Sequence, residues 1–152
     1  MTPSQKLAEL GLTLPQVAKP VANYIPAVRT GNYVYTSGQI PFKEGKLVIA
    51  GRVPTEVSLE KAAEGASIAV LNALAAAASV VGGIDNITRV VRVCVFVNCT
   101  PDFTDQPKVA NGASDLLCKI FGDAGKHARS AVGASGLPLG AAVEVELIAE
   151  VR

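Results

Sequence analysis

The last quarter of the chain, residues 127–152, has the sequence HARSAVGASGLPLGAAVEVELIAEVR and decides the fold. It predicts two strands, 127–132 and 142–151, joined by a loop rich in glycine and proline. The second strand alternates between apolar residues on one face and mainly acidic residues, including Glu144 and Glu146, on the other. Because Arg129 lies on the strand just before, one sheet holding both strands is expected to place a fixed cation near two carboxylates. The same pattern is also typical of a solvated face, where an ion pair contributes about 0–1 kcal/mol.

The composition is that of one domain with an unusually apolar chain. Of 152 residues, 18% are charged and 49% are hydrophobic, and the mean hydropathy is +0.35. Such an excess of apolar surface favours a subunit interface. The net charge is +1, aromatic residues make up 5%, and there is no tryptophan. Neither a basic surface nor a stacking platform for bases is predicted, so we expect no nucleic-acid partner.

The cysteines and the amino-terminal segment bear on metal binding and location. Cys94, Cys99 and Cys118 lack the spacing of a zinc site, and the chain has a single histidine, so we expect no metal. The amino-terminal residues lack the apolar core of a signal peptide, which predicts a reduced, cytoplasmic location. The segment 66–84 is apolar enough to raise the question of a membrane span. Because it is rich in alanine, contains polar residues and ends at two glycines, we interpret it as a buried helix.

The first part of the chain predicts a helical leader over residues 1–20, followed by a hairpin. Thr2 and Pro3 are typical of a helix start, because threonine caps and proline suits the first helical position. An extended segment over 20–28 is followed by a turn and a second strand over 33–36. The leader is therefore an addition in front of the sheet.

The middle of the chain predicts two helices on either side of one strand. Ser58 is placed to cap a long helix that ends near residue 81. The strand over 87–98 has apolar residues on both faces, which indicates burial on both sides. A second helical region begins at about residue 100, is interrupted by Pro107 and continues over 109–121. This order predicts one mixed sheet with both helices on a single face, and its uncovered face predicts contact with other subunits.

Several motifs, taken in order, resemble the RidA/YjgF family, whose members adopt a chorismate-mutase-like fold. They are TSGQIP at 36–41, VCVFV at 93–97, ARSAV at 128–132 and VEVELIAEV at 143–151. The resemblance spans residues 21–152, which makes it more specific than a single short motif. It implies one α+β domain over residues 1–152, with two helices on one face of a mixed sheet. It also implies homotrimers in which the sheets line a central barrel, with a site at each subunit boundary.

The same resemblance implies hydrolysis of reactive enamines and imines, such as 2-aminoacrylate, to 2-keto acids and ammonia without a cofactor. Arg129 matches the family arginine that binds the substrate carboxylate, a role suited to the planar fork of a guanidinium. Glu144 matches the acidic residue that activates the attacking water. His127 should share the face of Arg129, and we interpret it as a packing residue rather than a base.

Further positions are implied to bind the substrate. Tyr24 matches an aromatic residue contributed by a neighbouring chain, and Ser37 and Gly38 lie where the family's backbone faces the ligand. Asn111 matches a polar helix residue near the site. Ala131 stands where active members often have a cysteine, so that only its backbone N–H and C=O remain for the substrate. Plainer interpretations stay open: strand packing for Tyr24, a strand terminus for Ser37 and Gly38, and a solvated helix position for Asn111.

Two other functions stay open at this point. A non-catalytic trimeric module would bind a 2-keto acid or related carboxylate in the same cleft. Arg129 serves both that module and an enzyme, whereas Glu144 beside a water favours the enzyme. Endoribonuclease activity has also been attached to the family, but the near-neutral charge and scarce aromatics disfavour it. The expected partner is therefore a small carboxylate, with neither nucleic acid nor membrane involved.

Overall fold

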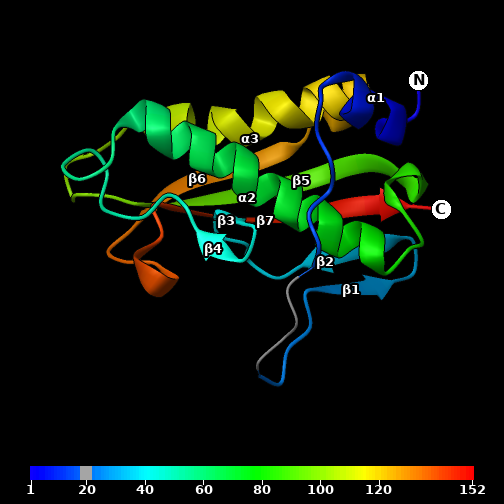
Figure 1. Ribbon diagram of the computed structural model, residues 1–152, viewed down its shortest axis with the longest axis horizontal. Helices are drawn as coiled ribbons and strands as arrows, with labels where there is room; N and C mark the ends of the chain where they lie inside the picture. The colour runs from blue at the N-terminus through cyan, green and yellow to red at the C-terminus, as the bar shows by residue number, and fades with distance from the viewer. Residues whose placement is uncertain (18–21) are drawn as a thin grey trace.

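The computed structural model describes residues 1–17 and 22–152 and has two long helices on one face of a mixed β-sheet (Figure 1). The helices and strands in chain order are α1 (Pro3–Glu9), β1 (Ala27–Thr30), β2 (Tyr33–Thr36), β3 (Phe42–Lys43), β4 (Lys46–Leu47), α2 (Leu59–Ser79), β5 (Ile87–Asn98), α3 (Gln106–Phe121), β6 (Ala128–Ala134) and β7 (Val143–Val151). Short 3-10 turns are η1 (Ile84–Asn86), η2 (Gly122–Gly125) and η3 (Pro138–Gly140). The predicted α+β class is confirmed.

The main sheet has the strand order β1-β2-β7-β5-β6, and β3 pairs with β4 in a separate hairpin. β7 is antiparallel to both of its neighbours, whereas β6 is parallel to β5. Both predicted carboxy-terminal strands therefore lie in one sheet, but β5 separates them. As a result, β6 is an edge strand whose outer side has no neighbour in the described part of the chain.

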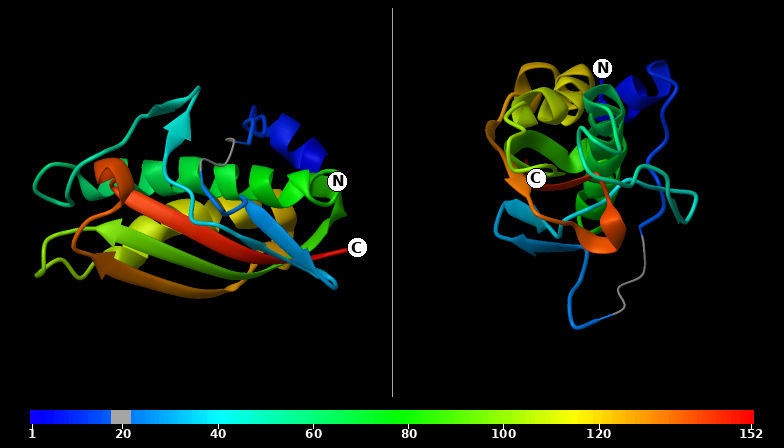
Figure 2. Two further views of the ribbon diagram at one scale, coloured as in Figure 1. Left: turned by 90° about the horizontal axis from the view of Figure 1, so that it is seen from below. Right: turned by 90° about the vertical axis from the view of Figure 1, so that its left-hand side faces the viewer.

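The two long helices cover the same face of this sheet, as predicted. α2 contacts β7 and β2, while α3 contacts β5 and β6. The end-on view in Figure 2 shows both helices above the sheet and the opposite face open. Large apolar side chains lie on that open face: Tyr33, Tyr35 and Val132 are 41%, 44% and 42% exposed. A monomer rarely leaves a row of such side chains in water, so the face is suited to contact with another chain.

Helix α2 is built mainly of alanine and lies close to α3. Ser58 caps it by accepting a hydrogen bond from the Lys61 N–H at 3.1 Å, as predicted. At the crossing, a Cβ on Gly112 of α3 would lie 1.9 Å from the carbonyl oxygen of Ala63, so only glycine fits there. By length and composition α2 could cross a membrane, but most of its apolar part is buried against the sheet and α3. The predicted buried helix is confirmed.

The central strand β5 departs from the prediction that it is buried on both sides. Register shifts fall between Ile87 and Arg89 and between Val90 and Arg92. These bulges leave both arginines exposed while Val90 and Val93 point into the core. A bulge adds one residue to a strand and so permits a spacing of three between buried residues. The second face is therefore less apolar than predicted.

Two predicted boundaries are corrected. α3 begins at Gln106 with Pro107 in its first turn, and the residues from 100 to 105 are not helical. Pro107 starts the helix rather than interrupting it, because a first-turn N–H has no partner within the helix anyway. The extended segment predicted over 20–28 becomes a strand only at Ala27, and residues 20 and 21 lie outside the described residues.

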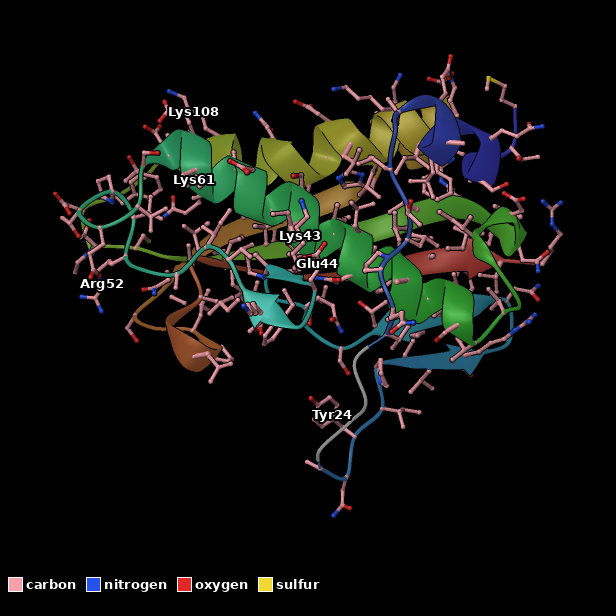
Figure 3. All side chains as sticks on the ribbon, in the orientation of Figure 1. Tyr24, Lys43, Glu44, Arg52, Lys61 and Lys108 are labelled. Carbon is pink, nitrogen blue, oxygen red and sulfur yellow. The ribbon has the colours of Figure 1, made fainter. Side chains whose placement is uncertain are left out.

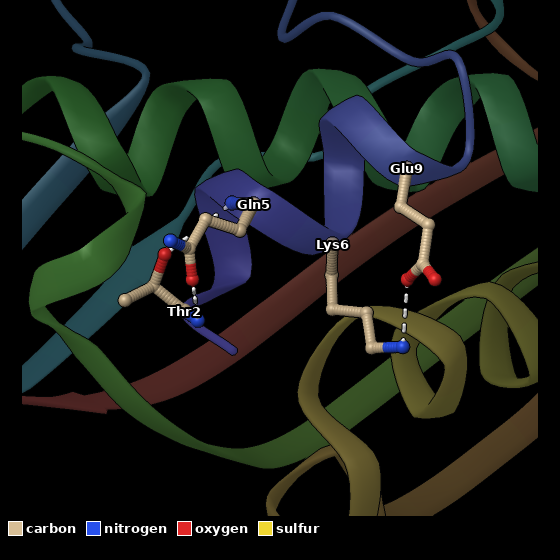
Figure 4. A network of polar contacts seen from close by, with 4 residues as sticks. All are labelled: Thr2, Gln5, Lys6 and Glu9. Carbon is tan, nitrogen blue, oxygen red and sulfur yellow. Dashed lines mark hydrogen bonds and ion pairs between the residues drawn. The ribbon is translucent and has the colours of Figure 1, made fainter.

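The leader helix α1 is anchored to the body of the domain. Thr2 and Gln5 form a capping box, in which each side chain accepts a hydrogen bond from the backbone N–H of the other (Figure 4). The N–H and hydroxyl of Ser4 both donate to the Asp85 carboxylate, and these bonds lower the pKa of Asp85 below its ordinary value. Leu7 is buried in the core. The helix ends at Glu9, so it occupies only the first part of the helical leader predicted over residues 1–20.

Candidate functional site

Arg129 projects from β6 toward α3 and is held there by neutral groups. Its Nη1 donates to Asn111 Oδ1 at 2.8 Å and to Ser114 Oγ at 3.1 Å. Within residues 1–17 and 22–152, no carboxylate lies at ion-pair distance from Arg129. A guanidinium has five N–H donors, so those on Nη2 and Nε are left for a ligand. This arrangement is suited to binding an anion.

Ala131 lies two residues further along the same edge strand. The Ala134 carbonyl accepts from the Cys99 N–H at 3.3 Å, which fixes the hydrogen-bonding direction along β6. Alternation along a parallel ladder then directs the N–H and C=O of Ala131 away from β5, toward the open edge. The structure thus brings together three predicted residues, Asn111, Arg129 and Ala131, which we call the arginine half-site.

Glu144 lies on β7 with Gly38 against it. A bridge between Gln39 and Val145 joins the two segments through backbone bonds of 2.8 and 2.9 Å. A Cβ on Gly38 would lie 2.8 Å from Glu144 Cδ, so the glycine makes room for the carboxyl group. Both residues line a surface hollow, together with Tyr24. We call Tyr24, Gly38 and Glu144 the carboxylate half-site.

The surroundings of Glu144 strengthen it as a base. Partial burial raises the pKa of Glu144 above its ordinary value, and the charge of Glu146 on the same strand face raises it further. Both effects disfavour the charged form of the carboxyl group. A carboxylate with a raised pKa accepts a proton more readily, which is the property that general base catalysis requires.

Ser37 and Tyr24 have different parts in this region. The Ser37 hydroxyl donates to the Ile25 carbonyl at 2.7 Å, and its N–H donates to the Pro26 carbonyl at 2.8 Å. Ser37 therefore fastens the segment before β1, and of its backbone groups the carbonyl is left for the predicted ligand contact. Tyr24 is 54% exposed on the loop that extends from the body of the domain (Figure 3). This exposure leaves the ring available for contact with a second chain.

Within one chain, Arg129 and Glu144 are not brought together. Arg129 pairs with Val93, and Val93 pairs with Leu147, whereas Glu144 pairs with Phe96. An offset of three positions places the two side chains on opposite faces of the sheet, because side chains alternate along a strand. The expected cation beside two carboxylates is therefore wrong for a single chain. β5 lies between the two strands, and the register turns the charges away from each other.

The sequence interpretation missed Ser114, a polar neighbour of Arg129. Ser114 accepts from the guanidinium, and its Oγ lies 2.8 Å from Nε2 of His127. Nδ1 of His127 lies 2.6 Å from the Gly125 carbonyl oxygen, so this histidine is a hydrogen-bonded residue and not merely a packing one. Ser114 follows Asn111 by three residues, and that helical spacing was a signal that could have identified it.

The open sheet face holds a second, smaller hollow. Its volume is about 160 Å³, and Arg92, Cys94 and Glu146 contribute its polar lining. Arg92 donates to Ser130 Oγ at 2.8 Å. Burial, together with Glu146, raises the pKa of Cys94, which makes it a poor nucleophile. In the described part of the chain, no three His, Cys, Asp or Glu residues are grouped closely enough to hold a metal ion.

Comparison with protein families finds one match over nearly the whole chain. The model described as "YjgF/chorismate mutase-like, putative endoribonuclease" matches residues 4–151. Among curated proteins, Protein TCP17 of Trypanosoma cruzi is 39% identical over 147 residues, covering 96% of this chain and 92% of the relative.

Solved structures with the same fold include one of high similarity. A protein of unknown function from Agrobacterium tumefaciens is 38% identical, with a TM-score of 0.92, and the match covers 99% of this chain and 94% of that one. TdcF of E. coli, solved with bound serine, is 23% identical with a TM-score of 0.64, covering 90% of this chain and 94% of that one. At that identity TdcF shows the shared fold alone.

Proposed function

Because the chain belongs to the YjgF/chorismate mutase-like family, we propose that it hydrolyses reactive enamines and imines bearing a carboxylate, such as 2-aminoacrylate, to 2-keto acids and ammonia. The observation that carries this proposal is the guanidinium of Arg129. It is held by neutral acceptors, and no carboxylate of the described residues lies beside it. A guanidinium presented in this way binds a planar carboxylate through two parallel hydrogen bonds.

The proposed site is completed by a second copy of the chain. The arginine half-site lies at the open edge of β6, and the carboxylate half-site lies at the other side of the sheet. A closed ring of three copies buries the exposed apolar face and sets the arginine half-site of one copy against the carboxylate half-site of the next. The substrate then binds between copies, with Tyr24 closing the cleft.

In this site the chain supplies binding and proton transfer. Arg129 binds the substrate carboxylate, and the backbone of Ala131 contacts it from the same strand. Glu144 takes a proton from water while the water oxygen bonds to C2 of the imine and the C=N electron pair moves to nitrogen. The proton then passes to that nitrogen and gives a carbinolamine. Glu144 next takes the hydroxyl proton and returns it to the nitrogen, so that the C–N bond breaks as C=O forms, and ammonia leaves the 2-keto acid. The raised pKa of Glu144 supports both steps, because the same group first accepts and then donates the proton.

Two other functions have less support. A module that only binds 2-keto acids uses Arg129 equally well, but has no use for a carboxyl group whose pKa is raised beside the ligand cleft. Endoribonuclease activity appears in the description of the family model. A net charge of +1 with 5% aromatic residues offers little surface for RNA. The cytoplasmic location remains a prediction from the sequence.

A coupled assay tests the proposal. 2-Aminoacrylate is generated in the cuvette by β-elimination from an amino acid, and the keto acid formed is followed with a dehydrogenase. Arg129→Ala should lower the rate at limiting substrate by at least about tenfold, because a charge-assisted hydrogen bond contributes about 1.5–3 kcal/mol. Arg129→Lys should recover little, since a point charge cannot copy the fork. Lys126→Ala, which removes a nearby exposed cation, is the matched control.

Glu144→Gln separates the enzyme from the binding module. Turnover should fall roughly 10²–10⁴-fold, while the calorimetric affinity for 2-ketobutyrate stays nearly unchanged. The catalytic half of the proposal is wrong if the glutamine variant retains the native rate. The binding half is wrong if Arg129→Ala binds 2-ketobutyrate as the native protein does.

A further inference from the structure

A row of hydrogen bonds runs from the end of α3 to Arg129. The Gly125 carbonyl oxygen lies 2.6 Å from Nδ1 of His127, and Nε2 of the same ring lies 2.8 Å from Ser114 Oγ. Ser114 Oγ in turn accepts from Nη1 of Arg129 at 3.1 Å. The proposed reaction assigns no part to Ser114 or His127. Yet Ser114 contacts the Arg129 guanidinium directly, and His127 contacts it through Ser114.

When the ring of His127 carries one proton, the chemistry of the end groups fixes the direction of every bond in this row. A carbonyl oxygen only accepts, so Nδ1 of His127 must carry the proton, and Nε2 of the neutral ring is then an acceptor. A guanidinium only donates, so Ser114 Oγ turns a lone pair toward Arg129 and its hydrogen toward Nε2. Each atom thus has one role, and the serine hydroxyl has a single orientation.

We propose that Ser114 and His127 are positioning residues that set the plane of the Arg129 guanidinium for the substrate carboxylate. Both hydrogens on Nη1 lie in the guanidinium plane, and they are taken by Asn111 and Ser114. Two fixed acceptors define that plane and direct Nη2 and Nε to the ligand. His127 acts one step further back, because its Nε2 keeps the serine lone pair facing Arg129. This inference rests on the proposed function and deepens it.

The use of neutral acceptors matters for binding. A carboxylate in place of Ser114 would also orient the guanidinium, but it would compete with the substrate for the positive charge. A hydroxyl backed by a neutral imidazole orients the guanidinium and leaves its charge for the ligand. The row ends at the Gly125 carbonyl, and Gly125 packs closely on α3. A Cβ on Gly125 would lie 2.4 Å from the Leu117 carbonyl oxygen, so this packing fixes the position of the Gly125 carbonyl.

Two isosteric variants of His127 separate positioning from packing. In His127→Asn the amide nitrogen replaces Nδ1 and keeps the bond to the Gly125 carbonyl, but the link to Ser114 is lost. In His127→Gln the terminal amide reaches the position of Nε2 and keeps an acceptor for Ser114. Ser114→Ala removes the link altogether. Ser79→Ala, which removes a helix hydroxyl bonded only to backbone at the end of α2, is the matched control.

The expected result is a change in KM with little change in kcat. Ser114→Ala and His127→Asn should each raise the KM for 2-aminoacrylate and the Kd for 2-ketobutyrate about three- to tenfold, with kcat within about twofold. His127→Gln and Ser79→Ala should stay near native values. The proposal is overturned if His127→Asn and His127→Gln behave alike, because packing alone would not distinguish them.

The tautomer of His127 provides a test that needs neither activity nor a variant. The chain has one histidine, so a ¹⁵N-detected spectrum of the imidazole is unambiguous. With the ring neutral, Nδ1 should be protonated and Nε2 bare, and saturating 2-ketobutyrate should shift the Nε2 signal in the native protein but not in Ser114→Ala. A proton on Nε2 overturns the positioning proposal. A normal tautomer with unchanged binding by Arg129→Ala would instead leave the row intact and reject the proposed function.

Discussion

Two inactive variants should restore activity when they assemble together. In the proposed trimer, each site takes Arg129 from one copy and Glu144 from the next, because the two lie on opposite faces of one sheet. An Arg129→Ala copy still has an intact carboxylate half-site, and a Glu144→Gln copy still has an intact arginine half-site. A site is native when the Glu144→Gln copy contributes its Arg129 and the neighbouring Arg129→Ala copy contributes its Glu144.

The size of the recovery follows from the geometry. Purification by both tags leaves only trimers that contain both variants, and about one site in three is native in such a closed ring, because only one of its three neighbouring pairs joins the two intact half-sites. The Glu144→Gln variant alone should retain at most about one hundredth of the native turnover. The mixed trimers should therefore show about a third of the native rate per chain, above either variant measured alone.

The assay uses two tagged variants produced in one cell and purified by both tags in turn. Rates of 2-aminoacrylate hydrolysis are compared with those of each homo-oligomer, and native mass spectrometry establishes that mixed oligomers formed. The control is a mixture of Arg129→Ala with the double variant that carries both Arg129→Ala and Glu144→Gln, because none of its sites contains the arginine. Mixed oligomers that remain as inactive as the single variants would refute the reasoning, since both residues would then act from one chain.

Four further outcomes are expected. Gly112→Ala should lower the free energy of unfolding by about 1–3 kcal/mol or more in urea denaturation, because its Cβ would meet the backbone of α2, while Gly136→Ala, with open space around it, should change little. Gly38→Ala should slow turnover about tenfold or more without loss of stability, because its Cβ would crowd the Glu144 carboxyl group; native turnover would show that this carboxyl group is not used. Turnover should fall with acid through the raised pKa of Glu144, with a midpoint above the ordinary 4.5 in a pH–rate profile. Tyr35→Glu should release monomers in sedimentation equilibrium; an unchanged trimer would show that the open face is not the interface.

The raised pKa of Glu144 also has a consequence for stability, and its sign is opposite to that of most carboxylates. Because the pKa is higher in the folded state, protonation favours folding, and the charged form costs stability once the pH exceeds the folded-state pKa. Glu144→Gln should therefore be more stable than the native protein at neutral pH. The difference should shrink as the pH falls through the folded-state pKa toward the unfolded one. Thermal unfolding across that range measures it.

Local patterns predicted the individual elements well. The bounds of β2 and β5 match the predicted ranges, and Ser58 caps α2 as expected. These features depend on residues close together in the sequence: alternation within a strand, a polar cap and a helical period. The buried nature of α2 followed from its alanine content for the same reason.

The relative placement of the elements was less accessible. β5 lies between β6 and β7, and the loop that joins those two strands carries no signal for this insertion. Strand register then decided which face Arg129 and Glu144 occupy, and a shift of one residue would have reversed it. The bulges of β5 could not be predicted either. The segment ITRVVRV alternates regularly only when two of its positions have no partner on β7, and the sequence does not show which two.

The separation of Arg129 from Glu144 has a chemical reason in the proposed reaction. A guanidinium beside Glu144 would favour the charged carboxylate and lower its pKa, which would weaken it as a base. The same contact would satisfy the guanidinium before any substrate arrived. Instead Arg129 has neutral partners, and Glu144 has a like charge and partial burial, so each is kept in the state its step requires. A substrate carboxylate between two copies would neutralise the arginine at binding, and the glutamate would then face an uncharged reaction centre with its raised pKa intact.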